Sequence, residues 1–168
     1  HTAELLIVAA RAVGSTGAQG VSLFLLPAGT TGVTRQWLPS MDQTRKQAAV
    51  HLDNVRLGEE ALLGESGQGW GPLSKVIDLA TIALAAEQVG GCQQLLDMTV
   101  AYTGERVQFN RTIASYQAVK HKAADMMLKT EVARSAVYYA ACIAQEALEG
   151  GALAGELREA ASVAKSYC

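Results

Sequence analysis

The pattern of hydrophobic and polar positions changes character about a third of the way along the chain. Up to that point the apolar runs are short and rich in β-branched or bulky residues, and turn-forming residues separate them. Runs of this length between glycine-rich turns predict strands, and their close spacing predicts an antiparallel sheet. The predicted strands cover residues 4–10, 21–27, 34–38 and 48–52.

A glycine-rich segment, GESGQGWG at residues 64–71, separates the strand-like part from a helical part. Its composition predicts a flexible junction. Gly71-Pro72 then opens a helix, because a proline in the first turn has no N–H to leave unsatisfied. The helical spacing that follows predicts a helix to about Tyr102, roughly 30 residues and ~45 Å long. Its apolar stripe is expected to consist of Leu73, Val76, Ile77, Ala80, Leu84 and Ala85.

Two adjacent glycines, Gly90 and Gly91, interrupt this predicted helix. Each costs about 1 kcal/mol relative to alanine in a helix interior. We expect that cost to be offset by another backbone that packs closely against the helix at this point.

Two further helices are predicted in the last third of the chain. Ser115 is a plausible N-cap for the first of them, Gly150-Gly151 is a typical helix end, and a third helix is expected from about Ala154 through Cys168. The stripe of the middle helix is expected to be Val119, Ala123, Met126, Thr130, Val137, Ala141, Ala144 and Leu148.

Long helices with short breaks between them predict antiparallel neighbours in a bundle. The predicted fold class is therefore α+β: the tail of an antiparallel β domain, followed by long antiparallel helices of an incomplete four-helix-type bundle. The expected domain boundary divides residues 1–66 from residues 67–168.

Composition narrows the function classes. The 168 residues are 49% hydrophobic and 18% charged, which is enough apolar material for a core and excludes a disordered chain. A net charge of -2 and a pI near 5.9 exclude a large cationic field, so no nucleic-acid partner is predicted. No apolar run is long enough to span a bilayer and no secretory signal opens the chain, so we expect a cytoplasmic protein with no membrane partner.

Cysteine and histidine usage predicts neither a disulfide nor a metal site. The three cysteines are far apart without a CxxC motif, which predicts reduced thiols, two of them buried. They are Cys92, Cys142 and Cys168. The three histidines are isolated and lack the spacing of metal ligands. They are His1, His51 and His121.

The segment between the first two helices, ERVQFNRTIASYQAVKH at residues 105–121, carries candidate chemistry. A helix that begins near Ser115 directs unpaired N–H groups and a partial positive charge at whatever precedes it, which favours an anion. Arg106 lies just across the loop, and arginine suits bidentate contact with phosphate.

Three further side chains extend this candidate site. Gln108 and Gln117 supply neutral donors for a pyrophosphate or a ribose, and Phe109 offers an apolar face to a ring system. The residues therefore indicate a nucleotide-phosphate site. The alternative is a plain helix hairpin with solvated arginines, in which Phe109 acts as a hydrophobic staple.

The longer segment VAYTGERVQFNRTIASYQAVKHKAADM resembles the acyl-CoA dehydrogenase family. The usual sequence motif of that family is close to E-x-x-x-x-R-x-x-F-G-x-P-I-x-x-F-Q-x-x-x-H-x-x-A-D-M. The residues in register are Arg106, Phe109, Ile113, Gln117, His121, Ala124, Asp125 and Met126. Two other segments, VSLFLLPAGTTGVTRQ and LDNVRLGEEALLGESGQGW, resemble the end of that family's central β domain and the crossover into its C-terminal helices.

The resemblance implies a flavoprotein with FAD as its cofactor. In the family, the residue that matches Arg106 binds the pyrophosphate of FAD, typically that of the neighbouring subunit. The position of Gln108 lies beside the same phosphates, Phe109 packs near the cofactor, and Gln117 also contacts FAD. The implied reaction is the α,β-desaturation of an acyl-CoA in fatty acid metabolism, with electrons passed to an electron-transfer flavoprotein or a similar acceptor. The implied assembly is a homo- or hetero-oligomer built as a dimer of dimers, such as a homotetramer.

The chain departs from the family pattern at several positions. Asn110 stands where the family has glycine, and asparagine tolerates a positive φ, so the turn is expected to persist. In the motif L-D-x-x-R, Thr81 replaces the arginine, which removes a cation from near the substrate, while Asp78 still matches the acyl-CoA contact position. Ala80 stands where some members place a catalytic glutamate.

No catalytic residue is assigned within the chain. The family's usual catalytic glutamate follows the third helix, and the family's N-terminal half precedes the strands found here. The first residue is His1 rather than methionine, which indicates a fragment that lacks the base and a full flavin pocket.

Three functions remain open from the sequence. The first is part of a flavin-dependent acyl-CoA dehydrogenase. The second is a noncatalytic partner subunit of a hetero-oligomeric dehydrogenase, which supplies Arg106 in trans, and Thr81 favours this alternative. The third is a stand-alone helical interaction module.

Overall fold

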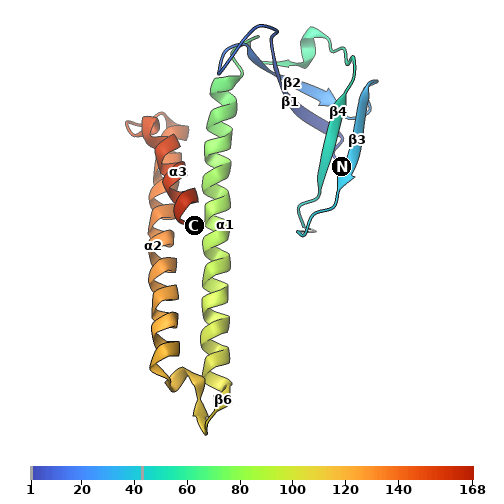
Figure 1. Cartoon of the computed structure of the whole chain (residues 1–168). Coiled ribbons are helices and arrows are strands. Elements are labelled where there is room, and N and C mark those ends of the chain that lie inside the picture. The colour runs from blue at the N-terminus through green and yellow to red at the C-terminus, as the bar shows by residue number, and fades with distance from the viewer. Residues whose placement is uncertain (1, 43) are drawn as a thin grey trace. The chain divides into compact units, whose positions relative to one another are not determined.

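The protein is described from a computed structural model that covers residues 2–42 and 44–168, so His1 lies outside the described residues. The chain divides into two compact units, the first ending at Leu73 and the second spanning Ser74–Cys168. Small antiparallel sheets make up the first unit and long helices the second (Figure 1). The predicted α+β class is confirmed.

Five strands are found among the described residues of the first unit. A three-stranded sheet has the order β1-β2-β5 and a separate two-stranded sheet pairs β3 with β4, with every pair antiparallel. The strands are β1 (Leu5–Arg11), β2 (Val21–Pro27), β3 (Val33–Leu38), β4 (Gln47–Leu52) and β5 (Leu62–Leu63), with a 3-10 turn η1 (Glu59–Ala61) before β5. The four predicted strands are confirmed to within one residue at each end.

The glycine-rich junction is more ordered than its composition predicted. The amide of Gly69 donates to the carbonyl of Val21 at 2.7 Å, and the amide of Gly67 donates to the Ser22 hydroxyl at 2.8 Å. A Cβ at Gly69 would lie 3.0 Å from the Val21 oxygen, so only glycine allows this approach without a shift. The junction is thus bound to β2, and the helix begins directly after it.

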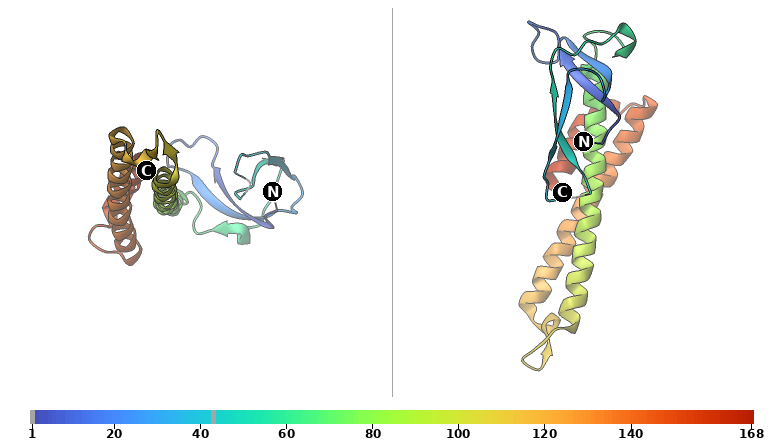
Figure 2. Two further views of the ribbon diagram at one scale, coloured as in Figure 1. Left: turned by 90° about the horizontal axis from the view of Figure 1, so that it is seen from below. Right: turned by 90° about the vertical axis from the view of Figure 1, so that its right-hand side faces the viewer.

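Three helices dominate the second unit. They are α1 (Trp70–Glu105), α2 (Gln117–Glu149) and α3 (Leu157–Tyr167). Between α1 and α2 lie a small hairpin and a 3-10 turn, namely β6 (Val107–Gln108), β7 (Arg111–Thr112) and η2 (Ile113–Ser115), and η3 (Ala154–Glu156) leads into α3. Figure 2 shows α1 and α2 side by side and antiparallel, with α3 alongside the C-terminal part of α2.

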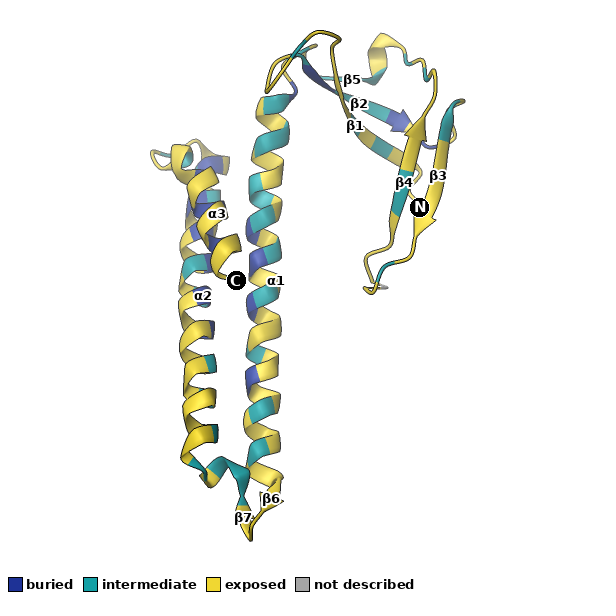
Figure 3. Cartoon of the chain, viewed as in Figure 1, coloured by how far each residue is buried: buried dark blue, intermediate teal, exposed yellow. Residues whose placement is uncertain are grey.

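The core of the helical unit is built largely from alanine. Its buried members are Ile82, Ala85, Val89, Ala133, Val137, Ala140, Ile143, Ala147, Leu157, Ala160, Ala161 and Ala164. Figure 3 shows these buried positions on the sides of the helices that face one another. Because alanine side chains are small, they let the backbones of α2 and α3 approach closely.

The predicted apolar stripes are partly wrong. On α1, Val76 and Ile77 are 60% and 49% exposed, and the buried stripe begins only at Ile82. On α2, Thr130 and Val137 are buried as predicted. Ala141 and Leu148 are exposed, because the contact runs instead through residues such as Ala140 and Ala147. The predicted stripe is therefore displaced by one position at these two residues.

Two other expectations also fail. Gly90 and Gly91 are exposed, and a Cβ added to either would meet nothing within 4 Å among the residues described, so no backbone packs closely on them here. Cys92 and Cys142 are exposed and Cys168 is half-buried, so the prediction of two buried thiols is wrong. The core of the helical unit is formed by other residues, so the three cysteine side chains lie at its edge or outside it.

Over residues 2–42 and 44–168, no helix has both the length and the apolar character that a bilayer crossing requires.

Candidate functional site

The candidate site is the hairpin that joins α1 to α2. The amide of Arg106 donates to the carbonyl of Tyr102 at 2.9 Å and so extends the helical bonding of α1 by one residue. The amide of Ile113 then donates to the carbonyl of Arg106 at 2.8 Å and closes the base of the hairpin. Between them, Val107 pairs with Thr112 and Gln108 pairs with Arg111.

The turn at the hairpin tip places two residues in the left-handed region. Phe109 has φ 53° and Asn110 has φ 61°. Positive φ at both central residues is the pattern of the tight turns that match strand twist. Asn110 therefore preserves the turn in the absence of glycine, as predicted, whereas Phe109 adopts a conformation that bulky residues rarely take.

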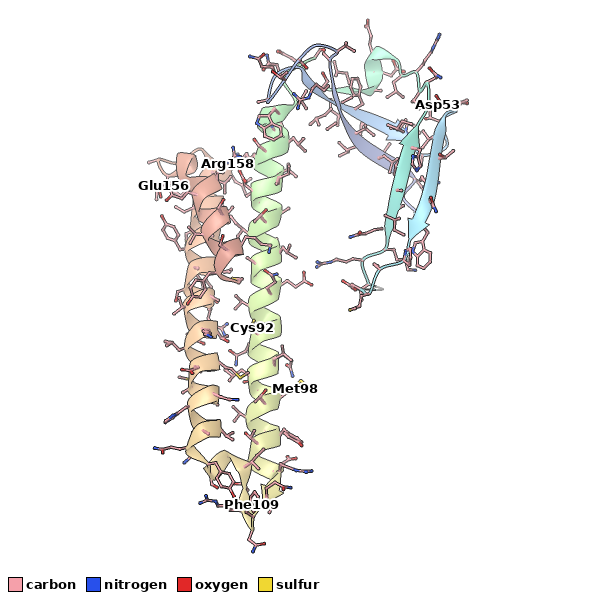
Figure 4. The ribbon with its side chains drawn as sticks, in the orientation of Figure 1. Asp53, Cys92, Met98, Phe109, Glu156 and Arg158 are labelled. Atoms are coloured by element: carbon pink, nitrogen blue, oxygen red, sulfur yellow. The ribbon has the colours of Figure 1, made fainter. Side chains whose placement is uncertain are left out.

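Phe109 points away from the protein. Its side chain is 89% exposed, and Figure 4 shows it at the end of the hairpin. It does not act as a hydrophobic staple within the described residues, which removes that part of the alternative interpretation. An exposed phenylalanine on a strained turn is instead available to another molecule.

The start of α2 differs from the prediction. Ser115 is not the N-cap: its hydroxyl donates to the carbonyl of Thr112 at 2.6 Å, and it ends the turn η2. Tyr116 occupies the N-cap position, no side chain caps the first turn, and that turn contains no acidic residue. The amide donors and partial positive charge at the start of this 33-residue helix are therefore not neutralised by a side chain of the first turn.

Tyr116 connects the helix start to the hairpin. Its hydroxyl donates to the carbonyl of Gln108 at 3.1 Å, and the guanidinium carbon of Arg111 lies 4.0 Å from the centre of its ring. Sequence reasoning did not assign either residue to the site. The signal was present, because a tyrosine directly before a helix and an arginine beside a two-residue turn lie within reach of one another.

Four of the five predicted site residues lie in this region. Arg106, Gln108 and Phe109 lie on the hairpin, Gln117 is the first residue of α2, and all four are exposed. A guanidinium, two amide side chains and an uncapped helix start together suit a pyrophosphate group. The exposed aromatic ring beside them suits the flat ring of a nucleotide cofactor, so the residues present fit FAD.

The fifth predicted residue, Asp78, lies elsewhere. It is half-buried on α1, and the 28 residues that separate it from Arg106 correspond to ~42 Å of helix. It lines a cavity of about 310 Å³ together with Lys75 and Arg158. The Lys75 ammonium donates to the carbonyl of Ala147 at 2.6 Å, where it complements the negative end of α2. The structure does not bring Asp78 together with the hairpin residues.

Thr81 lies one turn after Asp78. Its hydroxyl donates to the carbonyl of Ile77 at 2.8 Å. This bond within the helix directs its only donor away from any group beside the helix.

Among the described residues there is no group of three or more histidine, cysteine, aspartate or glutamate side chains that could hold an ion.

The comparisons with known proteins agree on one family. The family model described as "Acyl-CoA dehydrogenase, C-terminal domain" matches residues 67–168. The short-chain-specific acyl-CoA dehydrogenase of Megasphaera elsdenii is 33% identical over 146 residues, which are 86% of this chain and 38% of that protein. The acyl-CoA dehydrogenase IpdE2 of Mycolicibacterium smegmatis is 42% identical over 105 residues, 62% of this chain and 30% of that protein.

A solved structure shows the same fold. The butyryl-CoA dehydrogenase of Megasphaera elsdenii superposes with a TM-score of 0.84 at 31% identity, and the match covers 98% of this chain and 43% of that one. The chain thus spans less than half the length of these relatives.

Proposed function

This chain belongs to the acyl-CoA dehydrogenase family, and from that premise we propose that it forms part of an enzyme that desaturates an acyl-CoA thioester between its α and β carbons. Members of the family are FAD-dependent oxidoreductases. Within such an enzyme, residues 1–66 would form the C-terminal part of the middle β domain. Residues 67–168 would form the first three helices of the C-terminal domain that binds FAD and mediates oligomerisation.

The observation that carries the proposal is the hairpin beside the uncapped start of α2. Arg106 would bind the pyrophosphate of FAD in bidentate fashion, and Gln108 would lie beside the same phosphates. Gln117, at the first position of α2, would add an amide donor where the helix already favours negative charge. Phe109, exposed at the tip, would cover an apolar part of the cofactor.

FAD, when bound, supplies the acceptor for the hydride that leaves the β carbon of the substrate. The described side chains supply binding and orientation. Arg106 would offset the charge of the phosphates, and the exposed amides of Gln108 and Gln117 would fix their direction. No residue of this chain is assigned the removal of the α proton.

Asp78 is the proposed contact with the acyl-CoA. It is half-buried beside Lys75 and Arg158 in a cavity that combines positive and negative groups. A carboxylate in such a place accepts hydrogen bonds from the amide or hydroxyl groups of a CoA chain.

The noncatalytic partner subunit remains a second candidate because of Thr81. The family arginine at this position would place a cation near the substrate, and the Thr81 hydroxyl cannot replace it because it donates to Ile77. Turnover of the full-length protein with an electron-acceptor dye, measured alone and with candidate partner subunits, separates the two functions. Turnover only with a partner would identify the noncatalytic role.

The proposed setting follows from the family. We expect an oligomer, homomeric or heteromeric, in which the hairpin of one subunit contacts the FAD of another. The expected electron acceptor is an electron-transfer flavoprotein or a similar protein, and the expected compartment is the cytoplasm.

Arg106→Ala in the full-length protein tests the cofactor role. A hydrogen bond to a charged group contributes about 1.5 to 3 kcal/mol, so FAD affinity should fall by roughly 10- to 100-fold. Fluorescence titration of the FAD-free protein measures this. Arg56→Ala is the matched control, because Arg56 is an exposed arginine of the first unit and should leave FAD affinity unchanged. Equal affinity of the Arg106 variant and wild type would remove the proposed role.

A further inference from the structure

The side chain of Tyr116 spans from the start of α2 to the opposite strand of the hairpin. Its hydroxyl donates to the carbonyl of Gln108 at 3.1 Å, while its own carbonyl accepts the amides of Val119 and Lys120 in the first turn of α2. On its ring lies the guanidinium of Arg111, at 4.0 Å. Tyr116 is therefore bound to both strands of the hairpin and to the helix at once.

We propose that Tyr116 is a positioning residue for cofactor binding: it holds the hairpin in the shape that presents Arg106, Gln108 and Phe109 beside the start of α2. This inference rests on the proposed FAD site and concerns how that site is kept in its binding shape. Tyr116 need not touch the phosphates to act in this way.

The hairpin needs such support because little else holds it. Each strand is only two residues long, and a hairpin this short is marginal in water by itself. At the tip, Phe109 sits at φ 53°, a conformation that costs free energy for a bulky side chain and persists only when the surroundings enforce it. All the hairpin residues from Arg106 to Arg111 are exposed, so core packing does not enforce it.

The tyrosine bond acts where the strain is. Gln108 immediately precedes the strained turn, and its pairing partner across the hairpin is Arg111. The hydroxyl fixes the backbone on one side of the turn, and the ring fixes Arg111 on the other through a cation–π contact. The Tyr116 side chain thus contacts the residues on both sides of the turn, and Tyr116 is itself fixed to the start of α2.

A hairpin that is already ordered in the free protein favours ligand binding, because binding then loses less conformational entropy. If the hairpin fluctuated in the free protein, part of the binding free energy of FAD would be spent on ordering it. Loss of one neutral hydrogen bond corresponds to roughly a 3- to 10-fold change in an equilibrium constant. The same factor is expected in FAD affinity when the hydroxyl is removed.

The test compares Tyr116→Phe with Tyr138→Phe in the full-length protein. Tyr116→Phe keeps the ring under Arg111 and removes only the hydroxyl. Tyr138 lies on the same helix and is 68% exposed, so its variant removes a hydroxyl remote from the hairpin. Three quantities are measured on FAD-free protein: the affinity for FAD by fluorescence titration, hydrogen exchange of the Ile113 amide, which is bonded to Arg106, and the melting temperature.

Tyr116→Phe should weaken FAD binding by roughly 3- to 10-fold and speed exchange of the Ile113 amide, without changing the melting temperature. The control variant Tyr138→Phe should match wild type in FAD affinity, amide exchange and melting temperature. A change in melting temperature with normal FAD affinity would show a merely structural role and overturn the inference. Faster exchange with unchanged FAD affinity would do the same, because hairpin order would then not limit binding.

The Arg106→Ala variant separates the two proposals. If Arg106→Ala weakens FAD binding and Tyr116→Phe does not, the positioning role fails and the FAD site stands. If neither variant changes FAD affinity, the FAD site itself fails. A second variant, Arg111→Met, removes the cation above the ring and keeps the hydroxyl bond. It should also speed exchange of the Ile113 amide, and unchanged exchange in both variants would overturn the positioning role.

Discussion

Two tyrosine side chains of the α2 region, Tyr116 and Tyr139, each use their hydroxyl to bind a neighbouring element. At the start of α2, Tyr116 takes the N-cap position without capping, and its hydroxyl reaches the hairpin instead. Near its other end, the Tyr139 hydroxyl donates to the Glu156 carboxylate at 2.9 Å and links α2 to the turn before α3. This hydrogen bond, together with the negative charge of Glu156, raises the pKa of Tyr139 above its usual range.

The first prediction concerns this tyrosine. A raised pKa means that the bond stabilises the folded state fully below the ordinary tyrosine pKa of about 10 and is lost as pH rises through the raised value. Glu156→Gln removes the charge and should lower the pKa of Tyr139 toward its usual value. NMR titration of tyrosine labelled at the phenol carbon measures this pKa, and Tyr139→Phe assigns the signal. An unchanged pKa would mean that Glu156 does not set it.

At the scale of elements, the sequence predicted strands better than helix faces. Residues 21–27 were placed without error, because bulky apolar residues end there at turn-forming ones. The helix stripes were harder because much of the buried surface of α2 and α3 is alanine, and alanine occurs at both buried and exposed positions of these helices. Ala140 is buried and Ala141 is exposed, and no local pattern distinguishes them.

In the candidate site, too, some features could be predicted from the sequence and others could not. The motif resemblance led to the hairpin and to Asn110, whose positive φ follows from residue chemistry. The N-cap prediction failed at Ser115, because the hydroxyl that the sequence offered for capping bonds back to Thr112 within a 3-10 turn. The contact of Tyr116 with Gln108 depends on the turn geometry, which residue types alone do not define.

The second prediction tests the alanine contact between the helices. Ala140→Leu inserts extra volume into a position that is fully buried between helices, and overpacking of this kind costs about 1 to 3 kcal/mol. Ala141→Leu, at the exposed neighbouring position, should change the free energy of unfolding by less than about 0.5 kcal/mol. Urea unfolding followed by helical circular dichroism compares the two. Equal effects would show that the two positions are packed alike.

At the scale of the whole molecule, this chain accounts for less than half of the length of its relatives, and its helical unit leaves apolar surface uncovered. An apolar groove of about 680 Å³ runs between α1 and α2, lined by residues that include Leu96, Val100 and Met127. Exposed apolar surface of this kind marks contact with further protein.

The third prediction follows from that groove. Residues 1–168 produced alone should self-associate, and Met127→Glu should reduce the association by placing a charge in the groove. Sedimentation velocity over a range of concentrations measures it, with Lys129→Glu as a control for added negative charge on an exposed position of the same helix. A monomer that unfolds cooperatively would show that the three helices close their own core.

The phosphorus NMR spectrum of FAD bound to the full-length protein tests directly whether the hairpin and the start of α2 bind the pyrophosphate of FAD. Arg106→Lys keeps the positive charge but loses the planar fork that binds phosphate oxygens in pairs. If Arg106 binds the pyrophosphate, this substitution should shift the phosphorus resonances of the bound FAD, while Arg56→Lys should leave them in place. Identical spectra for Arg106→Lys and wild type would contradict this binding role.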